Sequence, residues 1–289
     1  MTPLQASLRA ASTRLASAGV PSASYDARAL AVHALGLHRP GDLVLVDELG
    51  EAHQVFTDLV ERRAARVPLQ HLVGRVGFRW LELEVGPGVF VPRPETEVVV
   101  QAALDALRDV PAPLCVDLCS GSGAVALALA QERPDAAVHA VEIDPAAMAW
   151  TRRNAAARAA AGDTSVALHL GDAATALPDL DGRVDLVISN PPYVATAERH
   201  VPDPEVLAHD PAVALWGGPD GLDLVRVVER TARRLLRPGG VVVVEHSDRQ
   251  GRSAPAVFAA AGCWRDVRDE QDATGRDRFV VAWRTGAEA

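Results

Sequence analysis

Four consecutive residues, Asn190, Pro191, Pro192 and Tyr193, could together hold a planar group that carries N–H donors. They follow VDLVIS at residues 184–189, an apolar run typical of a buried strand. The Asn190 side-chain oxygen and the Pro191 carbonyl can each accept a hydrogen bond. Proline fixes φ and favours extended geometry before it, so this carbonyl can face a ligand, and the tyrosine ring can stack on a planar group. The alternative is an Asn-Pro turn that only ends the strand.

A glycine-rich loop follows an earlier apolar segment, LCVDL at residues 114–118, which contains Asp117. The loop consists of Cys119, Ser120, Gly121, Ser122 and Gly123. Its two glycines allow a sharp turn and the close approach of a ligand, at the sheet edge where such folds bind ligands. Taken alone, the loop would also fit a dinucleotide or a turn without a ligand.

Acidic residues follow the next two strand-like segments. Glu142 lies about 20 residues beyond the loop, where a carboxylate can accept hydrogen bonds from both hydroxyls of a ribose. Asp172 can accept a hydrogen bond from the amino group of an adenine, although an acidic residue after a strand is often a simple turn residue. Asp144 precedes Pro145, a pair typical of a helix N-cap and first helical position. Together with the glycine-rich loop, these acids place a small or acidic feature at three successive strand ends. This set of features fits an adenosine better than a pyrophosphate.

Apolar runs that alternate with helical patterns predict an α/β fold. The expected strands lie at residues 114–118, 137–142, 166–170, 184–189 and 239–246. Continuous apolar strands separated by helices indicate a parallel sheet covered on both faces. The closing segments CWRDVRDEQ and DRFVVAWR are joined by the turn-like DATGRD, so we expect the last strand to be antiparallel.

The chain divides into three expected parts. Residues 1–75 are rich in Ala, Leu and Arg, with apolar positions at helical spacing, which predicts a small all-α domain. In residues 76–94 the pattern changes to alternating apolar and polar residues, with Gly-Pro-Gly at 86–88. This predicts a hairpin linker with its turn at these three residues. Residues 95–289 are expected to form the α/β domain.

Composition argues against several classes of protein. A net charge of -9 over 289 residues disfavours sequence-independent binding of nucleic-acid phosphates over a large surface, so we expect no stable nucleic-acid binding. The three cysteines have neither the paired spacing of a zinc site nor the even number of a disulfide framework, so we expect no metal. No stretch approaches the roughly 20 apolar residues of a membrane span. We expect a cytoplasmic protein without membrane contact.

The order of these features, a glycine-rich loop, two strand-end acids and Asn-Pro-Pro-Tyr, resembles the class I S-adenosylmethionine-dependent methyltransferases that modify planar nitrogens. The resemblance implies a Rossmann-like, seven-stranded sheet with an antiparallel last strand. The lone pair of an amide or aromatic amine is delocalised, so the nitrogen must be held with its lone pair toward the methyl group. Acceptors at Asn190 and Pro191 would do this and would stabilise positive charge growing on the nitrogen. The motif itself suits adenine, guanine and glutamine alike.

Other segments resemble one family in particular, the methyltransferases that modify the glutamine of peptide chain release factors. The matching segments are residues 62–97 with PRPETE, SYDARALAVHALG, ALWGGPDGLD at 214–223, Glu245-His246 with Gln250, and DATGRDR at 272–278. The resemblance covers almost the whole chain. It implies S-adenosylmethionine as cofactor, release factors as partners, methylation of the glutamine in their Gly-Gly-Gln motif, and a helical domain that helps to position this substrate.

The family pattern assigns roles to residues of this chain. The cofactor would contact Asp117, Cys119, Ser120, Gly121, Ser122, Gly123, Glu142, Asp172, Ala173 and Asn190. The glutamine would be held by Asn190, Pro191, Pro192 and Tyr193, of which Asn190, Pro191 and Tyr193 are the expected catalytic residues. Phe90, Arg93, Thr96 and Glu97 would lie near the methionine end of the cofactor, although Thr96 or Glu97 could also serve only as a helix cap.

Four residues depart from the family pattern. Cys119 replaces a loop glycine, Ala173 a larger residue that could cover the adenine, Asp210 a glutamate, and Ser247 a glycine. The backbone at Cys119 must therefore tolerate a side chain. We expect these changes to alter affinity rather than the type of reaction.

Two other functions stay open at this point. One is methylation of an exocyclic amine on a nucleic-acid base, against which the negative charge counts. The other is a non-catalytic, cofactor-binding regulator, which would not need the intact Asn-Pro-Pro-Tyr motif. Glu245 and His246 are interpreted as structural rather than as a catalytic base, because the proton of an amide can leave to water after methyl transfer.

Overall fold

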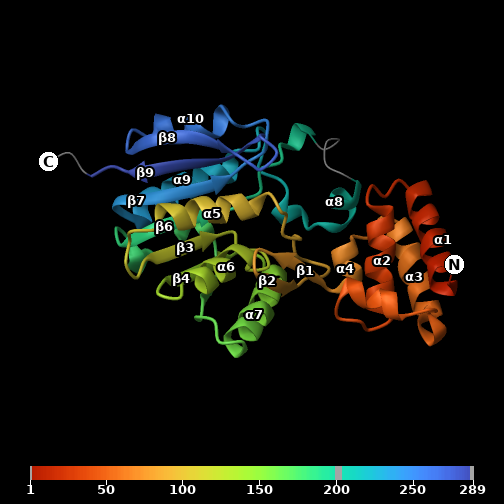
Figure 1. The fold of residues 1–289 in the computed structure, drawn as a ribbon. Coiled ribbons are helices and arrows are strands. Elements are labelled where there is room, and N and C mark those ends of the chain that lie inside the picture. The colour runs from red at the N-terminus through yellow and green to blue at the C-terminus, as the bar shows by residue number, and fades with distance from the viewer. Residues whose placement is uncertain (1, 199–203, 287–289) are drawn as a thin grey trace. The chain divides into compact units, whose positions relative to one another are not determined.

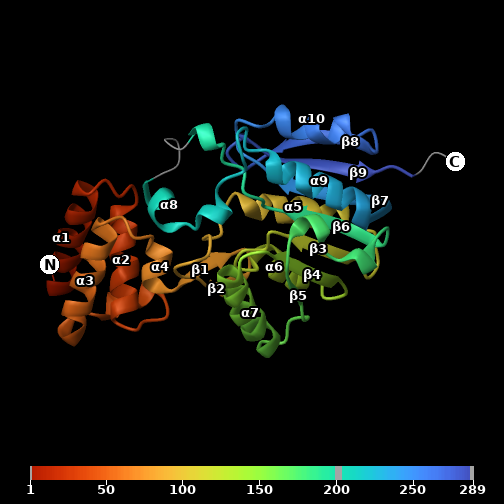
Figure 2. The same ribbon diagram turned by 180° about the vertical axis from the view of Figure 1, so that it is seen from behind.

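The computed structural model describes residues 2–198 and 204–286, and these form two compact units (Figures 1 and 2). We call residues 1–75, 85–87 and 203–209 the helical unit. We call residues 76–84, 88–202 and 210–289 the sheet unit. The helical unit is thus discontinuous in sequence, because it includes a short segment that follows the Asn-Pro-Pro-Tyr motif.

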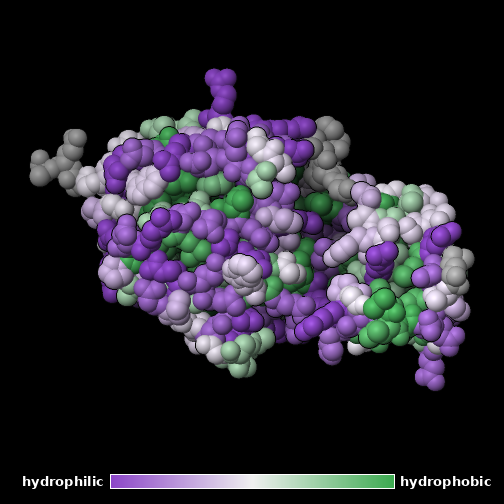
Figure 3. Space-filling view, in the orientation of Figure 1, coloured by the Kyte–Doolittle hydropathy of each residue, from purple (hydrophilic) through white to green (hydrophobic). Residues whose placement is uncertain are grey.

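The helical unit contains α1 (Pro3–Ser17), α2 (Ala23–Ala34), α3 (His53–Ala64), α4 (Leu69–Val73) and α8 (Pro204–His209), with the short 3-10 helices η1 (Pro40–Leu45) and η2 (Gly50–Ala52). Thr2 begins α1 with a reciprocal capping box to Gln5. Leu15, Leu30 and Phe56 are buried in a shared core, which stabilises the packing of the first three helices. Apolar surface is also exposed on the visible face of this unit (Figure 3).

One buried charge cluster ties α8 into the helical unit. The Arg63 guanidinium on α3 donates to Asp26 on α2 at 2.7 Å and pairs with Glu205 on α8 at 2.8 Å. Arg66 also donates to Glu205, at 2.7 Å. The side chains of Arg63 and Asp26 are only 5% and 2% exposed, so each charge needs the other to offset its lost hydration.

The sheet unit is built on a seven-stranded sheet in the order β5-β4-β3-β6-β7-β9-β8. The strands are β3 (Leu114–Leu118), β4 (Ala137–Glu142), β5 (Ala167–Leu170), β6 (Val184–Ser189), β7 (Leu236–Glu245), β8 (Trp264–Gln271) and β9 (Asp277–Arg284). β3 to β7 pair in parallel, and β9 pairs antiparallel with both β7 and β8. The predicted α/β class, the seven strands and the antiparallel last strand are confirmed.

Helices cover both faces of this sheet (Figures 1 and 2). They are α5 (Thr96–Ala106), α6 (Ala124–Glu132), α7 (Pro145–Ala160), α9 (Asp223–Leu235) and α10 (Ser253–Ala260), joined by the 3-10 helices η3 (Ala173–Thr175), η4 (Pro178–Leu180), η5 (Thr196–Glu198) and η6 (Ala212–Ala214). Side chains along β6 alternate between two cores: Leu186 and Ile188 pack with α5 and α6, and Val187 packs with α9 and α10. β6 is therefore buried on both sides, as its apolar sequence predicts.

The hairpin before the sheet has its turn in a different place from the one expected. β1 (Arg75–Phe78) and β2 (Leu81–Glu84) form a two-stranded sheet, with only Arg79 and Trp80 between them. The turn expected at residues 86–88 is therefore wrong. Arg79 adopts a positive φ of 51° and is held there by side-chain bonds to Glu132 and to the Glu97 carbonyl. These long-range bonds select a turn that its residue types do not signal.

Candidate active site

The Asn-Pro-Pro-Tyr motif lies at the end of β6, the central strand between β3 and β7. We call Asn190–Tyr193 the clamp. Ser189, the last residue of β6, donates its hydroxyl to the Leu118 carbonyl of β3 at 2.7 Å. This bond fixes the strand end next to the end of β3, so the clamp and the glycine-rich loop emerge from neighbouring strands at the same sheet edge.

The segment at residues 214–223 packs directly against the clamp backbone. A Cβ atom on Gly217 would lie 2.6 Å from the Pro192 carbonyl oxygen, and one on Gly221 would lie 2.3 Å from that of Tyr193. Only glycine permits this close approach. Gln250 adds a hydrogen bond from its amide to the Tyr193 carbonyl at 3.2 Å. The glycines of ALWGGPDGLD and the distant Gln250 therefore hold the clamp in shape.

The amide of Asn190 has a defined direction. Its nitrogen donates to the Thr96 hydroxyl at 3.1 Å, which leaves the amide oxygen as an acceptor. Thr96 is buried at the first position of α5, and Glu95 occupies the cap position, so Thr96 does not cap the helix. Glu97 does not cap it either: its carboxylate accepts the Arg79 backbone N–H at 3.2 Å.

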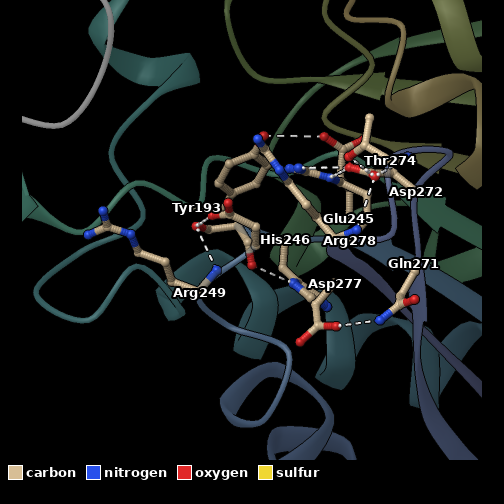
Figure 4. Close-up of polar contacts among 12 residues, drawn as sticks. Tyr193, Glu245, His246, Arg249, Gln271, Asp272, Thr274, Asp277 and Arg278 are labelled. Carbon is tan, nitrogen blue, oxygen red and sulfur yellow. Dashed lines mark hydrogen bonds and ion pairs between the residues drawn. The ribbon is translucent and has the colours of Figure 1, made fainter.

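Tyr193 is anchored by a buried carboxylate. Its hydroxyl donates to Glu245 at 3.2 Å (Figure 4), and Glu245 is 1% exposed at the end of β7. Burial raises the pKa of Glu245 to about 7, although the charge of Arg278 and the hydrogen bond from Tyr193 act to lower it. The tyrosine ring, expected to stack on a substrate, is therefore fixed through its hydroxyl.

His246 is unsuited to act as a base on the substrate. It is fully buried, and its ring nitrogens lie 2.8 Å from the Ser247 carbonyl and 2.8 Å from Asp269. Burial lowers its pKa, which keeps the imidazole neutral. Burial also raises the pKa of Asp269, to about 7. These contacts agree with the structural interpretation of His246.

The glycine-rich loop adopts left-handed backbone at three positions. Cys119, Gly121 and Gly123 have φ values of 63°, 57° and 85°. A side chain in this region costs roughly 1–2 kcal/mol, so Cys119 carries the strain expected where the family has glycine. A Cβ on Gly123 would lie 2.9 Å from the Thr151 methyl carbon, so this position also requires glycine. Burial raises the pKa of the Cys119 thiol to about 12 and keeps it neutral.

Two polar residues of α7 hold this loop through hydrogen bonds to its carbonyl groups, and neither was predicted from the sequence. Thr151 donates its hydroxyl to the Gly121 carbonyl at 2.6 Å. The Asn154 amide donates to the Ser122 carbonyl at 3.0 Å. The Ser120 hydroxyl in the same loop is buried and has no hydrogen-bond partner among the described residues, so it can serve a ligand.

Glu142 and Asp117 lie behind the loop as two buried acids. Glu142 accepts the Gly121 backbone N–H at 2.8 Å and the Asp144 backbone N–H at 2.9 Å. Each carboxylate oxygen can accept a further hydrogen bond, so these contacts are compatible with binding a ribose diol. Asp117 accepts the Ala126 N–H at 3.1 Å and so supports the start of α6. Burial raises the pKa of both acids.

Asp172 and Ala173 lie just beyond β5, which is the neighbour of β4 in the sheet. Asp172 is exposed and accepts the Ala174 N–H at 2.8 Å, which is a turn role. Ala173 is buried, and its carbonyl accepts the Thr231 hydroxyl at 3.0 Å. Sequence reasoning missed Ile143, whose side chain is 54% exposed directly after Glu142 and could cover a flat base.

A second group of predicted residues gathers around Arg93. Its guanidinium pairs with Asp210 at 2.9 Å and lies 4.9 Å from the centre of the Phe90 ring. Asp210 therefore keeps an ion pair although it replaces the glutamate of the family pattern.

Within residues 2–198 and 204–286, no cluster of three or more His, Cys, Asp and Glu side chains could hold a metal ion. No helix of that part is long and apolar enough to cross a membrane.

The fold and the site define an S-adenosylmethionine-dependent methyltransferase. A methyltransferase small domain model matches residues 82–207, and a PrmC N-terminal domain model matches residues 6–74. The crystal structure of a methyltransferase from Pyrococcus furiosus has the same fold, with a TM-score of 0.53 at 17% identity over 78% of this chain and 99% of that chain.

Curated relatives narrow the class to one family. The release factor glutamine methyltransferase of Mycolicibacterium smegmatis is 49% identical over 98% of this chain and 99% of its own length. The enzyme of that name from Streptomyces coelicolor is 56% identical over 81% of this chain and 84% of its own. A 4-amino-L-phenylalanine/4-methylamino-L-phenylalanine methyltransferase from Streptomyces pristinaespiralis is 45% identical over 81% and 79%. This chain belongs to the release factor glutamine methyltransferase family.

Proposed function

We propose that this enzyme transfers a methyl group from S-adenosylmethionine to the side-chain amide nitrogen of the glutamine in the Gly-Gly-Gln motif of peptide chain release factors. The observation that carries the proposal is the direction of the Asn190 amide. Because its nitrogen is taken up by Thr96, its oxygen is left to accept an N–H of the substrate. Membership of the family supports the choice of glutamine as that substrate.

The residues of this chain act on the substrate nitrogen as follows. The Asn190 oxygen and the Pro191 carbonyl each accept one N–H of the glutamine amide. These two hydrogen bonds fix the orientation of the amide nitrogen, so that its lone pair points toward the methyl group. The bound cofactor supplies an activated methyl group on a positively charged sulfur. As bonding to that methyl develops, positive charge grows on the nitrogen, and the two acceptors stabilise it. The proton is lost to water afterwards, so no protein base is needed.

The cofactor would be held by the glycine-rich loop and by acids at the strand ends. The buried Ser120 hydroxyl has no hydrogen-bond partner in the part of the chain that the structure describes. This free hydroxyl and the left-handed loop glycines fit a ligand that approaches the backbone closely. We propose Asp117, the loop residues, Glu142, Asp172, Ala173 and Asn190 as its binding residues.

A free aromatic amine is the second candidate substrate, because one relative is named for 4-amino-L-phenylalanine. The same clamp could hold an arylamine nitrogen. Purified enzyme should therefore be given labelled S-adenosylmethionine with a release factor, with 4-amino-L-phenylalanine, or with DNA and ribosomal RNA. Label in the release factor alone is expected. Label in the arylamine or a nucleic acid, with none in the release factor, would overturn the proposal.

Glu142 provides a test of the cofactor site. We expect Glu142→Ala to weaken S-adenosylmethionine binding by roughly 1.5–3 kcal/mol, the range for hydrogen bonds to a charged group. Asp144→Ala is the control, because it removes the cap of α7 but keeps the backbone N–H that Glu142 binds. That control should lose about 1 kcal/mol of stability and no affinity. Calorimetry that shows unchanged affinity in folded Glu142→Ala would remove Glu142 from the site.

We propose a division of labour between parts of the chain: residues 1–75 recognise the protein substrate, 76–94 link, and 95–289 carry out catalysis. The helical unit exposes two adjacent apolar side chains on η1, Val44 at 85% and Leu45 at 83%. Exposed apolar groups of this kind are typical of protein interaction sites. Action on release factors would place the enzyme in the cytoplasm.

Replacing Val44 and Leu45 together by serine tests this division. We expect KM for an intact release factor to rise about tenfold, because apolar contact area is lost. The rate on a short peptide with the Gly-Gly-Gln sequence should not change, since such a peptide lacks the rest of the factor that the helical unit is proposed to recognise. Equal effects on peptide and intact factor would contradict the assignment.

A further inference from the structure

Asn154 on α7 connects the β1–β2 hairpin to the glycine-rich loop. Its amide oxygen accepts the Glu84 backbone N–H at 2.7 Å, and its amide nitrogen donates to the Glu84 carbonyl at 3.0 Å. The same nitrogen donates to the Ser122 carbonyl at 3.0 Å. Asn154 is only 2% exposed, so bulk water cannot replace these partners. One buried amide therefore joins two segments that are far apart in the sequence.

The partners of Asn154 determine the direction of its amide. A backbone N–H can only donate and a carbonyl can only accept, so the amide oxygen faces the Glu84 N–H and the nitrogen faces the two carbonyls. Both N–H groups of the amide are used in this way. Aspartate at this position would lack both donors, and alanine would lack all three bonds.

The hairpin that Asn154 binds is itself fixed within the sheet unit. Phe78, Leu81 and Leu83 are buried in the core that they share with α6, and β2 lies beside α7 in both ribbon views (Figures 1 and 2). At the turn, Arg79 donates to Glu132 of α6 at 2.7 Å. The hairpin is therefore a firm support to which the loop is attached.

The loop carbonyl that Asn154 binds lies between two left-handed glycines, Gly121 and Gly123. Glycine allows many backbone conformations, so bonds from outside the loop are needed to select one. Thr151, three residues before Asn154 on the same face of α7, holds the Gly121 carbonyl, and Asn154 holds that of Ser122. The loop is thus arranged before a ligand arrives, which lowers the entropy cost of binding.

We propose that Asn154 is a positioning residue for the cofactor, because it holds the glycine-rich loop in its binding conformation by anchoring it to the backbone of β2. The hairpin then contributes to the cofactor site in addition to its proposed linking role. The proposal rests on the proposed function, since it concerns the same loop and the same S-adenosylmethionine. Its effects should appear in cofactor affinity and not in the chemical step.

Asn154→Ala should raise the Kd and the KM for S-adenosylmethionine about tenfold, as expected when a buried hydrogen bond that orders a binding loop is lost. The kcat at saturating cofactor and the KM for a release factor should stay within about twofold of those of the parent. Calorimetry and steady-state kinetics measure these constants. A fall in kcat without a change in Kd would contradict the proposal.

Asn154→Asp provides a readout that a general loss of stability would not affect. The introduced carboxylate lacks both donors and repels the Glu84 and Ser122 carbonyls, so cofactor affinity should fall. Protonation restores one donor and removes the repulsion, and burial raises the pKa of such a group. Lowering the pH from about 8 to about 6 should therefore bring the affinity closer to that of the parent at the same pH. A ratio of affinities that does not change with pH would contradict the proposal.

Two substitutions at Glu84 test the part played by the hairpin. Glu84→Pro removes the backbone N–H that Asn154 accepts, on an edge strand where proline is tolerated, and should raise the Kd for the cofactor about threefold to tenfold. Glu84→Ala keeps both backbone groups and loses only an exposed side chain, so the Kd should not rise. Equal rises in the two variants would overturn the backbone pairing.

The double variant tests whether the hairpin acts through Asn154. In the Asn154→Ala background, Glu84→Pro should cause little additional loss of cofactor affinity, because both substitutions remove the same chain of bonds. Fully additive losses would show that the hairpin acts on the loop without Asn154, which would overturn the proposed anchoring.

Trp264→Phe is the control for folding. The Trp264 indole N–H donates to the buried Glu229 at 2.9 Å, and β8, which carries Trp264, is an edge strand separated from β3 by β6, β7 and β9. Losing this bond should lower the stability of the sheet unit without changing the Kd for S-adenosylmethionine. Equal rises of Kd in Trp264→Phe and Asn154→Ala would overturn the positioning role, since they would indicate a general loosening of the fold.

The outcomes distinguish this inference from the proposed function. If the parent enzyme binds S-adenosylmethionine but does not methylate a release factor, the proposed function fails, and calorimetry on the variants still decides the role of Asn154. If the parent methylates the factor, but folded Asn154→Ala has the Kd and KM of the parent for the cofactor, the positioning role is wrong.

Discussion

Asn190→Ala should lower turnover on a release factor by about 10²–10³-fold, as losing one aligned stabilising group does in other enzymes. Its oxygen accepts most strongly when positive charge has developed on the substrate nitrogen, so the effect on kcat should exceed that on release-factor affinity. Single-turnover kinetics at saturating S-adenosylmethionine measure the chemical step directly. A near-normal rate in folded Asn190→Ala would mean that the motif is only a turn after β6.

Asn190→Asp is the sharper variant at the same position. Aspartate keeps an acceptor toward the substrate but loses the donor that binds the Thr96 hydroxyl at 3.1 Å. We expect turnover to fall although the side chain is almost the same size. Full activity in Asn190→Asp would show that the bond to Thr96 has no role in orienting the amide.

Arg63→Ala should lower the free energy of unfolding of the helical unit by about 3–5 kcal/mol, the cost of leaving a buried charge without its partner. Asp26, with a side chain only 2% exposed, would lose the guanidinium 2.7 Å away. Glu205 on α8 would lose its ion pair with Arg63 and keep the one with Arg66. The five tryptophans all lie beyond residue 75, so circular dichroism, rather than tryptophan fluorescence, should be followed in urea.

Arg14→Ala is the control for this substitution. Arg14 pairs with Glu61 at 2.7 Å in the same unit, but the two side chains are 47% and 55% exposed. An exposed pair contributes about 0–1 kcal/mol, so this variant should unfold almost as the parent does. Equal losses in the two variants would contradict the claim that burial makes the Arg63 cluster important.

The strands could be predicted because each buried strand appears in the sequence as a short run of apolar residues. β3, β4 and β6 begin and end at the expected residues, since each is a short apolar run between turn residues. The hairpin turn could not be predicted. Gly-Pro-Gly at residues 86–88 carries a strong turn signal, whereas Arg79 carries none and adopts its positive φ through bonds to residues far along the chain.

The candidate site could be predicted only where one short segment supplies its chemistry. The clamp and the glycine-rich loop are each continuous in sequence, and their residue types indicate what they could bind. The Asn190–Thr96 bond joins residues 94 positions apart, and the Asn154–Ser122 bond joins residues 32 apart. Such pairs depend on how helices pack on the sheet, and a single sequence contains no local pattern that indicates them.

Mass spectrometry of a release factor after reaction tests the central claim most directly. The factor should be incubated with the enzyme and S-adenosylmethionine, digested, and fragmented to locate any added methyl group. We predict one added methyl on the side-chain nitrogen of the glutamine in the Gly-Gly-Gln motif, and none with Asn190→Ala over the same time. A methyl group on any other residue, or an unmodified glutamine beside a methylated nucleic acid or free amine, would contradict the account.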